Sequence, residues 1–448
     1  MAIFKARVRS TLTMALGASA LSLIVATPSL AQLAPSPNTA ALIAAADGNP
    51  QWASTAAYVG ALCPNLTPGT DLRLRCAAAL SAAVNAQPLA TTALHQITPQ
   101  QVLAQSGVVD GAVMPATAAV ASRLSAIGHI GIGGPLASNN YRPIALASAG
   151  DTAGLGGASA ARLQGYVNLV GGSGSRDTTT IDSGYSFDQK SITGGVDYRF
   201  SDRFTGGVSV SWGDTRTDFD ANQGKMKSTA VVGTLYGLWT VNDRVQVSGL
   251  LSYGKIDFSN DRYINYAENA VSTISRIAHG DTKGDQWEGT VTANYAMSGT
   301  DGWSYGPSLS ISARSLDLDA YAETGAAGLN LTYADQSTQS LQLAAGFDVA
   351  KAISTQTGVI SPYARVQAIY ETKDNRRNII VHYVDDHTGF FPGIRLTTDS
   401  PDRLRFQGAV GVSGQFANGW SGFADVETVV GLRNVSGYTG TLGLRKEF

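Results

Sequence analysis

The sequence of 448 residues is short of long hydrophobic runs, net charge and cysteine. After Leu30 no stretch approaches the roughly 20 consecutive apolar residues that a membrane-spanning helix needs, which excludes a helical membrane protein. The formal net charge of −2 gives no indication of a nucleic-acid partner. The two cysteines, Cys63 and Cys76, are too few for a disulfide-rich scaffold.

The first residues of the chain have the pattern of a secretory signal peptide. Basic residues come first, an apolar run covers residues 12–25, and the small side chains of Ser29 and Ala31 stand where a signal peptidase cuts. We therefore expect residues 1–31 to be removed after export through the Sec translocon. Because the periplasm is oxidising, Cys63 and Cys76 are expected to form a disulfide, and two unpaired buried thiols are the alternative.

Residues 32–112 have helical rather than strand spacing and predict a small α-helical module. One helix is expected over 71–85, and a capping box with Pro at the first helical position begins another at residues 98–101. Gly107 is expected to stop that second helix. A further helix over 113–127, followed by a Gly-, Ala- and Ser-rich stretch, makes residues 113–162 a separate segment.

From Leu163 onward the period changes to two. Phe204, Val208 and Trp212 alternate with small polar residues, which puts an apolar, aromatic face opposite a polar one. Short turns alternate with longer connections, as in bacterial outer-membrane barrels. The predicted fold is an all-β transmembrane barrel of about twelve antiparallel strands, covering 163–448 and preceded by the helical module. The expected strands are 163–171, 185–200, 204–213, 225–240, 244–258, 284–297, 303–316, 338–351, 358–372, 403–416, 420–433 and 437–448. Residues 378–384 also alternate, but a thirteenth strand there would give the barrel an odd number of strands. We therefore assign this segment to a long connection.

The last strand ends the chain on an aromatic residue. Tyr438, Leu442, Leu444 and Phe448 share its apolar face. This strand resembles the C-terminal strand of outer-membrane β-barrels, and the resemblance implies that these four residues are read by the barrel-assembly machinery.

Three strings carry a closer resemblance. Residues 194–202 look like the second strand and turn of the autotransporter (type Va secretion) barrel, 362–365 like a late strand and 442–448 like its terminus. The resemblance covers about 155–448. It implies a monomeric barrel in the outer membrane of a Gram-negative bacterium, in contact with lipid, with 113–162 threading the pore. The N-terminal passenger is then short, about eighty residues over 32–112, without β-helix repeats.

Charged residues on the polar parity of the strands are the candidate functional residues of the lumen. We expect them to pair with one another and to brace the pore segment, and a selectivity or self-cleavage role is the alternative. They are Glu288, Arg314, Asp348, Arg365, Arg405, Asp425 and Glu427.

Signs of catalysis are few, and neither a cofactor nor a metal is expected. Asn139-Asn140 resembles the cleavage pair of self-cleaving autotransporters, but it lies among Gly, Pro and Ser instead of in a helix. Residues 382–387 hold two His and two Asp, which could bind a metal or act in acid–base chemistry. The module has neither a Gly-x-Ser-x-Gly elbow nor the Gly-Asp-Ser string of esterase autotransporters.

We therefore expect a non-catalytic translocator that exports or displays its short passenger. A barrel adhesin or pore plugged by the N-terminal helices is the second hypothesis. A surface enzyme that uses residues 382–387 is the third.

Overall fold

The computed structural model describes residues 35–127 and 162–448 except 374–375, 390, 400–401 and 417–418. The predicted signal peptide, the Asn139-Asn140 pair and the linker 128–161 lie outside the described residues. Of the helices within the described part, none combines the length and the hydropathy needed to cross a bilayer.

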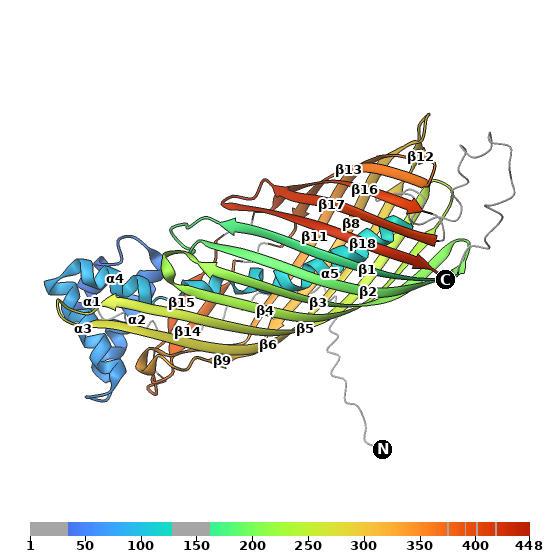
Figure 1. Ribbon diagram of the computed structural model, residues 1–448. Helices are drawn as coiled ribbons and strands as arrows, with labels where there is room; N and C mark the ends of the chain where they lie inside the picture. Colours follow the sequence, from blue (N-terminus) through green and yellow to red (C-terminus); the bar gives the residue numbers. More distant parts are fainter. Residues whose placement is uncertain (1–34, 128–161, 374–375, 390, 400–401, 417–418) are drawn as a thin grey trace, which may run out of the picture. The chain divides into compact units, whose positions relative to one another are not determined.

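Twelve antiparallel strands form a closed barrel, as predicted (Figure 1). They are β1 (Leu163–Arg176), β2 (Tyr185–Ser201), β3 (Phe204–Phe219), β4 (Gly224–Thr240), β5 (Val245–Ala267), β6 (Thr273–Tyr295), β8 (Trp303–Leu318), β11 (Gln336–Lys351), β13 (Gly358–Glu371), β16 (Leu404–Phe416), β17 (Trp420–Val430) and β18 (Val435–Glu447). The last strand pairs with the first, with Leu444 opposite Val167, so the barrel leaves no open edge there. The short strands β7 (Met297–Ser298) and β12 (Ile353–Thr355) extend two of the turns.

The two faces of each strand differ as their period predicts. On β3 the side chains of Phe204, Val210 and Trp212 are exposed outward, whereas Ser209 and Ser211 are buried toward the lumen. The nine residues from 204 to 212 match the roughly 9–11 that a tilted strand needs to cross the hydrocarbon core. Aromatic residues at both limits of this run are typical of an interface girdle.

One predicted loop is wrong. Residues 259–283 form the continuation of β5 and β6, joined by a turn over 268–272. The continuation buries Ile264, Tyr266 and Ile274 in a core with the N-terminal helices. The two strands are longer than predicted because their apolar residues pack against residues that are distant in the sequence. The local alternation of polar and apolar residues gives no information about such contacts.

The piece at 378–384 does lie outside the barrel, but it is not irregular. It forms β14 (Asn378–Tyr383) in a second sheet whose strand order is β15-β14-β10-β9. The partners are β15 (Ile394–Thr397), β10 (Leu331–Tyr333) and β9 (Tyr321–Ala322). The helical turn η4 (Ala327–Leu329) lies between β9 and β10, and η3 (Asp220–Asn222) lies in the connection between β3 and β4.

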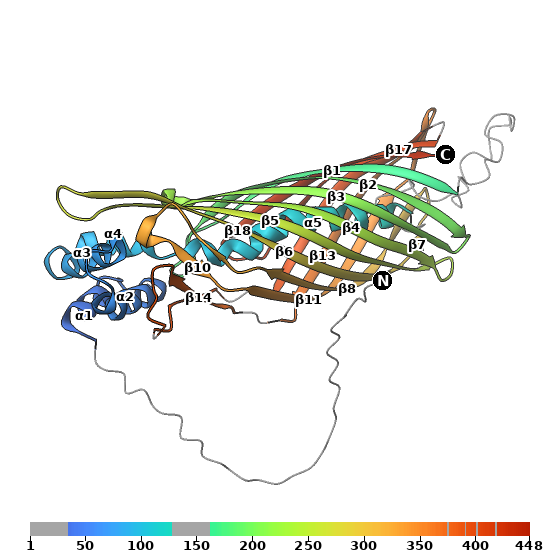
Figure 2. The ribbon, with the colours of Figure 1, turned by 90° about the horizontal axis from the view of Figure 1, so that it is seen from below.

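The N-terminal residues form α1 (Pro37–Ala44), α2 (Pro50–Leu62), η1 (Cys63–Asn65), α3 (Asp71–Asn85), α4 (Gln87–Ile97), η2 (Gln100–Ala104) and α5 (Gln105–Ile127). Ser36 and Asn49 cap α1 and α2: the Ser36 side chain accepts from Thr39 N at 3.2 Å. Figure 2 shows α1–α4 at the barrel end with the long connections, and α5 inside the barrel.

The predicted stop at Gly107 is wrong, because α5 runs through it. Both glycines of α5, Gly107 and Gly111, face the wall of the barrel. A Cβ on Gly107 would lie 3.5 Å from the Tyr185 hydroxyl, and one on Gly111 would lie 2.9 Å from Thr215 Oγ1. These glycines therefore let the helix approach the strands closely.

Candidate functional site

Helix α5 lies in the lumen against the wall formed by β1–β5. Val120 and Leu124 of the helix share an apolar cluster with Tyr236 of β4. The backbones come so close that a Cβ on Gly213 would collide with the carbonyl oxygen of Ala112. The helix thus fills one side of the lumen by close packing.

A buried ion pair fixes α5 near the end with the short turns. Arg123 Nε donates to Asp197 Oδ2 at 2.7 Å, and Arg123 Nη2 donates to Asp197 and to Gln164 Oε1. Their side chains are only 4% and 1% exposed. Tyr236 donates its hydroxyl to the same carboxylate, and the Arg123 guanidinium lies over the Tyr166 ring. Each partner is satisfied, as a buried charge pair requires.

Sequence reasoning missed both residues of this pair. Arg123 is the only charged residue between 111 and 127, and Asp197 stands on the lumen parity of β2. A lone charge on an apolar helix that must enter a lumen was the available signal.

Two of the predicted lumen charges stand near α5. Glu288 of β6 accepts a hydrogen bond from Thr117 Oγ1 at 3.3 Å, which ties the helix to the wall. Arg314 of β8 is the register partner of Glu288.

The other five stand on β11–β17. Arg365 pairs with Asp348 at 3.3 Å, and Arg405 donates to Gln342 Oε1 at 3.0 Å. Asp425 accepts from the Tyr363 hydroxyl at 3.0 Å, and Glu427 lies two residues further on the same face. The Arg365–Asp348 contact joins neighbouring strands, whereas the other two hydrogen bonds each span an intervening strand of the wall.

At the other end of the barrel, α1–α4 and the long connections share one apolar core. Leu62 and Leu94 of the helices are packed with Ile264 of β5, Leu331 of β10 and Val381 of β14. All of them are fully or almost fully buried. Burial of each such side chain contributes about 1.5–3 kcal/mol, so this core is the principal attachment of the module.

Hydrogen bonds and an ion pair also join the module to the barrel and fix its orientation. The Gln51 side chain donates to Thr397 O at 2.6 Å and accepts from Thr397 N at 3.1 Å, which satisfies the free edge of β15. Arg276 of β6 forms a two-pronged bond to Asp71 of α3, at 2.5 and 2.8 Å. This hydrogen bonding holds the pKa of Asp71 below its ordinary value.

A second buried ion pair lies within the long connections. Arg262 of β5 donates to both carboxylate oxygens of Glu323, at 3.0 and 2.6 Å. The same carboxylate accepts from the Tyr333 hydroxyl and from Leu331 N. With every oxygen bonded, the pair orders the small sheet beneath the helices.

Residues 382–387 pack against α2. The Tyr58 hydroxyl donates to Asp386 Oδ2, and the Tyr58 ring stacks on Tyr383. Burial by itself would raise the pKa of Asp386, but hydrogen bonds from Thr388 and Tyr58 bring that pKa below its ordinary value. Within the described residues no group of three or more His, Cys, Asp or Glu side chains could hold a metal ion.

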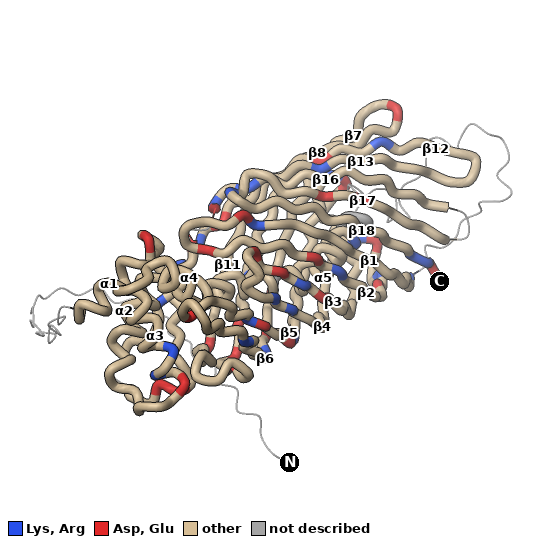
Figure 3. The backbone as a smooth tube through the Cα atoms, turned by 60° about the vertical axis from the view of Figure 1, so that its left-hand side comes forward, with Lys and Arg blue, Asp and Glu red and all other residues tan. Residues whose placement is uncertain are grey.

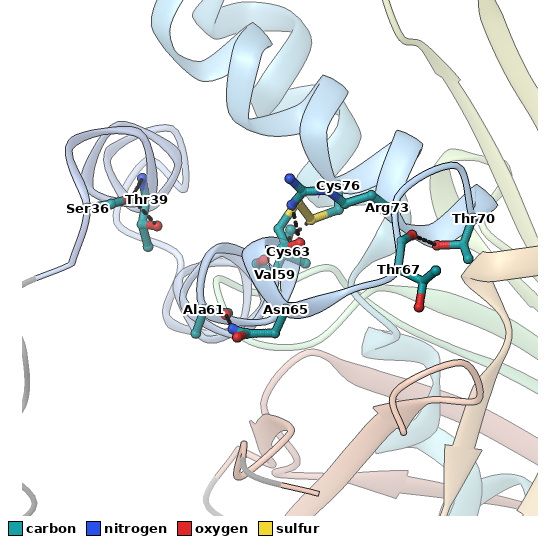
Figure 4. The surroundings of a disulfide bond; sticks show 10 residues. All are labelled: Ser36, Thr39, Val59, Ala61, Cys63, Asn65, Thr67, Thr70, Arg73 and Cys76. Carbon is teal, nitrogen blue, oxygen red and sulfur yellow. Dashed lines mark hydrogen bonds between the residues drawn. A yellow bond between two sulfur atoms is a disulfide. The ribbon is translucent and has the colours of Figure 1, made fainter. Parts of the chain in front are cut away.

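Cys63 and Cys76 are joined by a disulfide that ties η1 to α3 (Figure 4). Arg73 of α3 donates to Cys63 O and lies 3.3 Å from Cys63 Sγ. The bond closes a loop with a sequence separation of 13. At the opposite end of the chain, Tyr438, Leu442 and Leu444 of the expected assembly signal are on the outward face of β18, and Phe448 directly follows this strand; the four side chains are 55–75% exposed.

Comparison with known proteins places the barrel in a family. The Autotransporter beta-domain model matches residues 165–427. Esterase EstA of Pseudomonas aeruginosa is 26% identical over 239 residues, which cover 52% of this chain and 35% of EstA. Lipase 1 of Photorhabdus luminescens is 23% identical over 64% of this chain and 40% of its own length. The chain therefore matches less than half the length of these curated relatives.

Among solved structures, the translocator domain of autotransporter NalP from Neisseria meningitidis has a TM-score of 0.51 and 16% identity. The match covers 64% of this chain and 88% of that domain. At this identity the likeness shows a common fold. Together with the family match over residues 165–427, it identifies the chain as a member of the autotransporter β-domain family, with its barrel in the outer membrane of a Gram-negative bacterium.

Proposed function

We propose that the barrel exports the short N-terminal module and keeps it as a folded cap on its outer mouth, without catalysis. The observation that carries this proposal is the apolar core that α1–α4 share with Ile264, Leu331 and Val381 of the long connections. A passenger destined for release would not need to bury its own core in the barrel.

The direction of the chain supports export. Helix α5 leaves the module at the long-connection end and runs through the lumen toward the end with the short turns. In outer-membrane barrels the longer loops are extracellular. We propose that the module reaches this side through the barrel, after Sec-dependent export of the chain and insertion by the barrel-assembly machinery.

The proposal of no catalysis rests on the module itself. The names of the relatives attribute esterase and lipase activity to those proteins, which extend well beyond the matched region. The sequence has no Gly-Asp-Ser string, and the Tyr58 and Thr388 contacts of Asp386 explain the polar residues at 382–387 as packing.

A barrel that acts as an adhesin through its own loops is the second candidate. The observation in its favour is the extended β5–β6 hairpin. Its turn over residues 268–272 lies outside the shared core, and Val271 there is 96% exposed.

The test is protease shaving of intact cells that carry an epitope tag at Pro35-Ser36-Pro37. We expect the tag to be lost on intact cells while residues 37–448 stay in the membrane fraction. Protection of the tag until the outer membrane is permeabilised would contradict export, and release of the module into the medium would contradict retention.

A further inference from the structure

A groove of about 670 Å³ lies on the outer, lipid-facing wall of the barrel, over β2–β6. Its exposed side chains are apolar or aromatic. Phe200 and Phe204 border it at the end with the short turns, and Leu235, Leu251 and Val291 border it further along the strands. A volume of this size falls within the roughly 300–1,000 Å³ of small-molecule sites. The groove is therefore large enough to hold one chain of a lipid.

Glycines on the outward face of three neighbouring strands make the floor of the groove. Gly237 of β4 is the register partner of Gly206 of β3 and of Gly249 of β5, so the wall lacks side chains there. A Cβ on Gly237 would lie 3.2 Å from the Phe204 ring. A Cβ on Gly249 would meet only the carbonyl oxygen of Thr290, at 3.7 Å. The groove is thus bounded by an aromatic ring over β4 and open over β5.

Two arginines stand in the short turns at the near end of the groove. Charged residues are concentrated on the barrel rather than on α1–α4, as Figure 3 shows. Arg203 directly precedes Phe204, and Arg244 ends the turn before β5. Both are exposed, and neither forms an ion pair with any of the residues that the structure describes. Arg244 Nη1 donates to the Tyr295 hydroxyl at 3.4 Å, and Tyr295 is on the outward face of β6, so this guanidinium lies beside the lipid-facing wall.

The carboxylates of the two turns compensate this charge only in part. Asp202 accepts a hydrogen bond from Arg199 at 2.9 Å, which leaves Asp243 near Arg203 and Arg244. Three arginines therefore stand with two carboxylates, an excess of one positive charge. Planar guanidinium groups match phosphate oxygens in pairs, and basic residues near a membrane surface attract anionic head groups.

The groove and the arginines occupy different depths of the membrane. Aromatic residues mark the level of the lipid head groups, and Phe200, Phe204 and Trp239 are exposed at this end of the strands. The arginines lie in the turns next to this aromatic level, whereas the glycine floor lies on the other side of it, among apolar side chains. In outer-membrane barrels the short turns are periplasmic. An amphipathic ligand of the periplasmic leaflet would therefore meet both features at once.

We propose that this groove binds one anionic phospholipid, with an acyl chain over Gly249 and the phosphate group at Arg203 and Arg244. A second copy of the barrel fits less well. Symmetric pairing through the same groove would bring the arginines of the two copies together, and like charges would repel, whereas a phosphate neutralises them. The inner side of the same wall carries Asp197, the partner of Arg123, so the bound lipid covers the wall behind the ion pair that holds α5.

The test is native mass spectrometry of the full mature chain in a neutral detergent, titrated with dioleoyl phosphatidylglycerol. Dioleoyl phosphatidylcholine, which has the same acyl chains without the net charge, is the comparison lipid. We expect saturable binding of one phosphatidylglycerol per chain. Its affinity should exceed that of phosphatidylcholine by at least about fivefold, because each basic residue near a head group contributes about this factor.

Filling the groove tests the place of the acyl chain. Gly249→Leu puts a side chain on its floor and should weaken binding of both lipids by at least about tenfold, the loss expected when about two CH₂ groups are no longer buried. Gly233→Leu is the matched control. Gly233 is on the outward face of β4 outside the groove, and a Cβ there would meet nothing within 4 Å, so this variant should bind as the parent does.

The head-group contact is tested separately. Arg203→Gln/Arg244→Gln should bind both lipids with equal affinity, and this measurement stands even where Gly249→Leu fails to insert, because only exposed turn residues change. Absence of saturable binding to the parent would overturn the proposal. So would an undiminished preference for phosphatidylglycerol in the arginine variant, or equal affinity of Gly249→Leu and the parent when both show the heat-modifiable mobility of a folded barrel. A lipid-free dimer of the parent would assign the groove to a second copy instead.

Discussion

The end of the barrel with the short turns holds α5 by a buried ion pair between Arg123 and Asp197, whereas the opposite end holds α1–α4 by an apolar core. An ion pair sets the register of the helix in the lumen, and it fails if one partner is lost. The apolar core distributes its free energy over many side chains and needs no exact alignment. The ion pair thus fixes the position of α5, and the apolar core supplies most of the free energy that holds α1–α4 on the barrel.

Introducing a charge into the apolar core should have the largest effect. Ile264→Asp removes a fully buried side chain and buries an unpaired carboxylate, which together cost more than about 5 kcal/mol. We expect trypsin to cut the module at Arg73 and Arg75 while the barrel keeps its heat-modifiable mobility. The control is Ile277→Asp on the same hairpin, where the side chain is 54% exposed, and it should remain resistant. Equal resistance of both variants would show that the shared core does not hold the cap.

Removal of one partner of the ion pair ranks second. Arg123→Leu leaves Asp197 buried without its cation, a loss of about 3–5 kcal/mol. The expected result is an α5 that leaves its place in the lumen, measured as increased single-channel conductance in planar bilayers. The control is Arg199→Leu on β2, the strand that carries Asp197. Its partner Asp202 is 92% exposed, and exposed ion pairs contribute little to stability. An unchanged conductance for Arg123→Leu would contradict the role of the pair.

Loss of the disulfide ranks third. Cys63→Ser/Cys76→Ser opens a loop of 13-residue separation, and closing a loop of this length is worth about 3 kcal/mol. We expect faster trypsin cleavage within α3 and no change in the barrel. Identical cleavage rates with and without reductant in the parent protein would argue against a stabilising role.

The smallest effect concerns pH. Burial lowers the pKa of His95 from its ordinary value of 6.5, so the unfolded module takes up the proton first. Stability of the module should therefore fall as the pH drops below 6.5, and trypsin should cut it faster at pH 5.5 than at pH 7.5 after correction for the enzyme's own pH dependence. His95→Gln should lessen this difference, and a parent protein that is more resistant at the lower pH would contradict the assignment.

The barrel and the helical character of the module could be predicted from the sequence, but the packing of the module on the barrel could not. A period of two, aromatic residues at both limits of the outward face and the C-terminal Phe448 are local signals, and they sufficed for twelve strands. The β5–β6 continuation looks like a loop because polar residues surround Ile264, and its apolar partners come from residues 42–103 and 321–396. Only the fold brings these distant segments together.

The candidate site shows the same division. The parity of the strands identified Glu288 and Arg405 as lumen residues, because alternation reports which face a side chain occupies. The alternation of polar and apolar residues along a strand does not indicate which lumen residue contacts α5. The pairing of Arg123 with Asp197 depends on where α5 enters the barrel, and residues 98–112 were expected to end a helix at Gly107 instead of continuing it.

The central claim is that the module is a cap on the outer surface, and labelling from outside the cell tests it most directly. Leu74→Cys places a thiol at a 50% exposed position of α3, and Ile353→Cys places one at a 45% exposed position beside the short turns. On intact cells we expect a membrane-impermeant maleimide to label the Leu74→Cys protein at once. The Ile353→Cys protein should react only after the outer membrane is permeabilised. The reverse pattern, or protection of both positions on intact cells, would contradict the account.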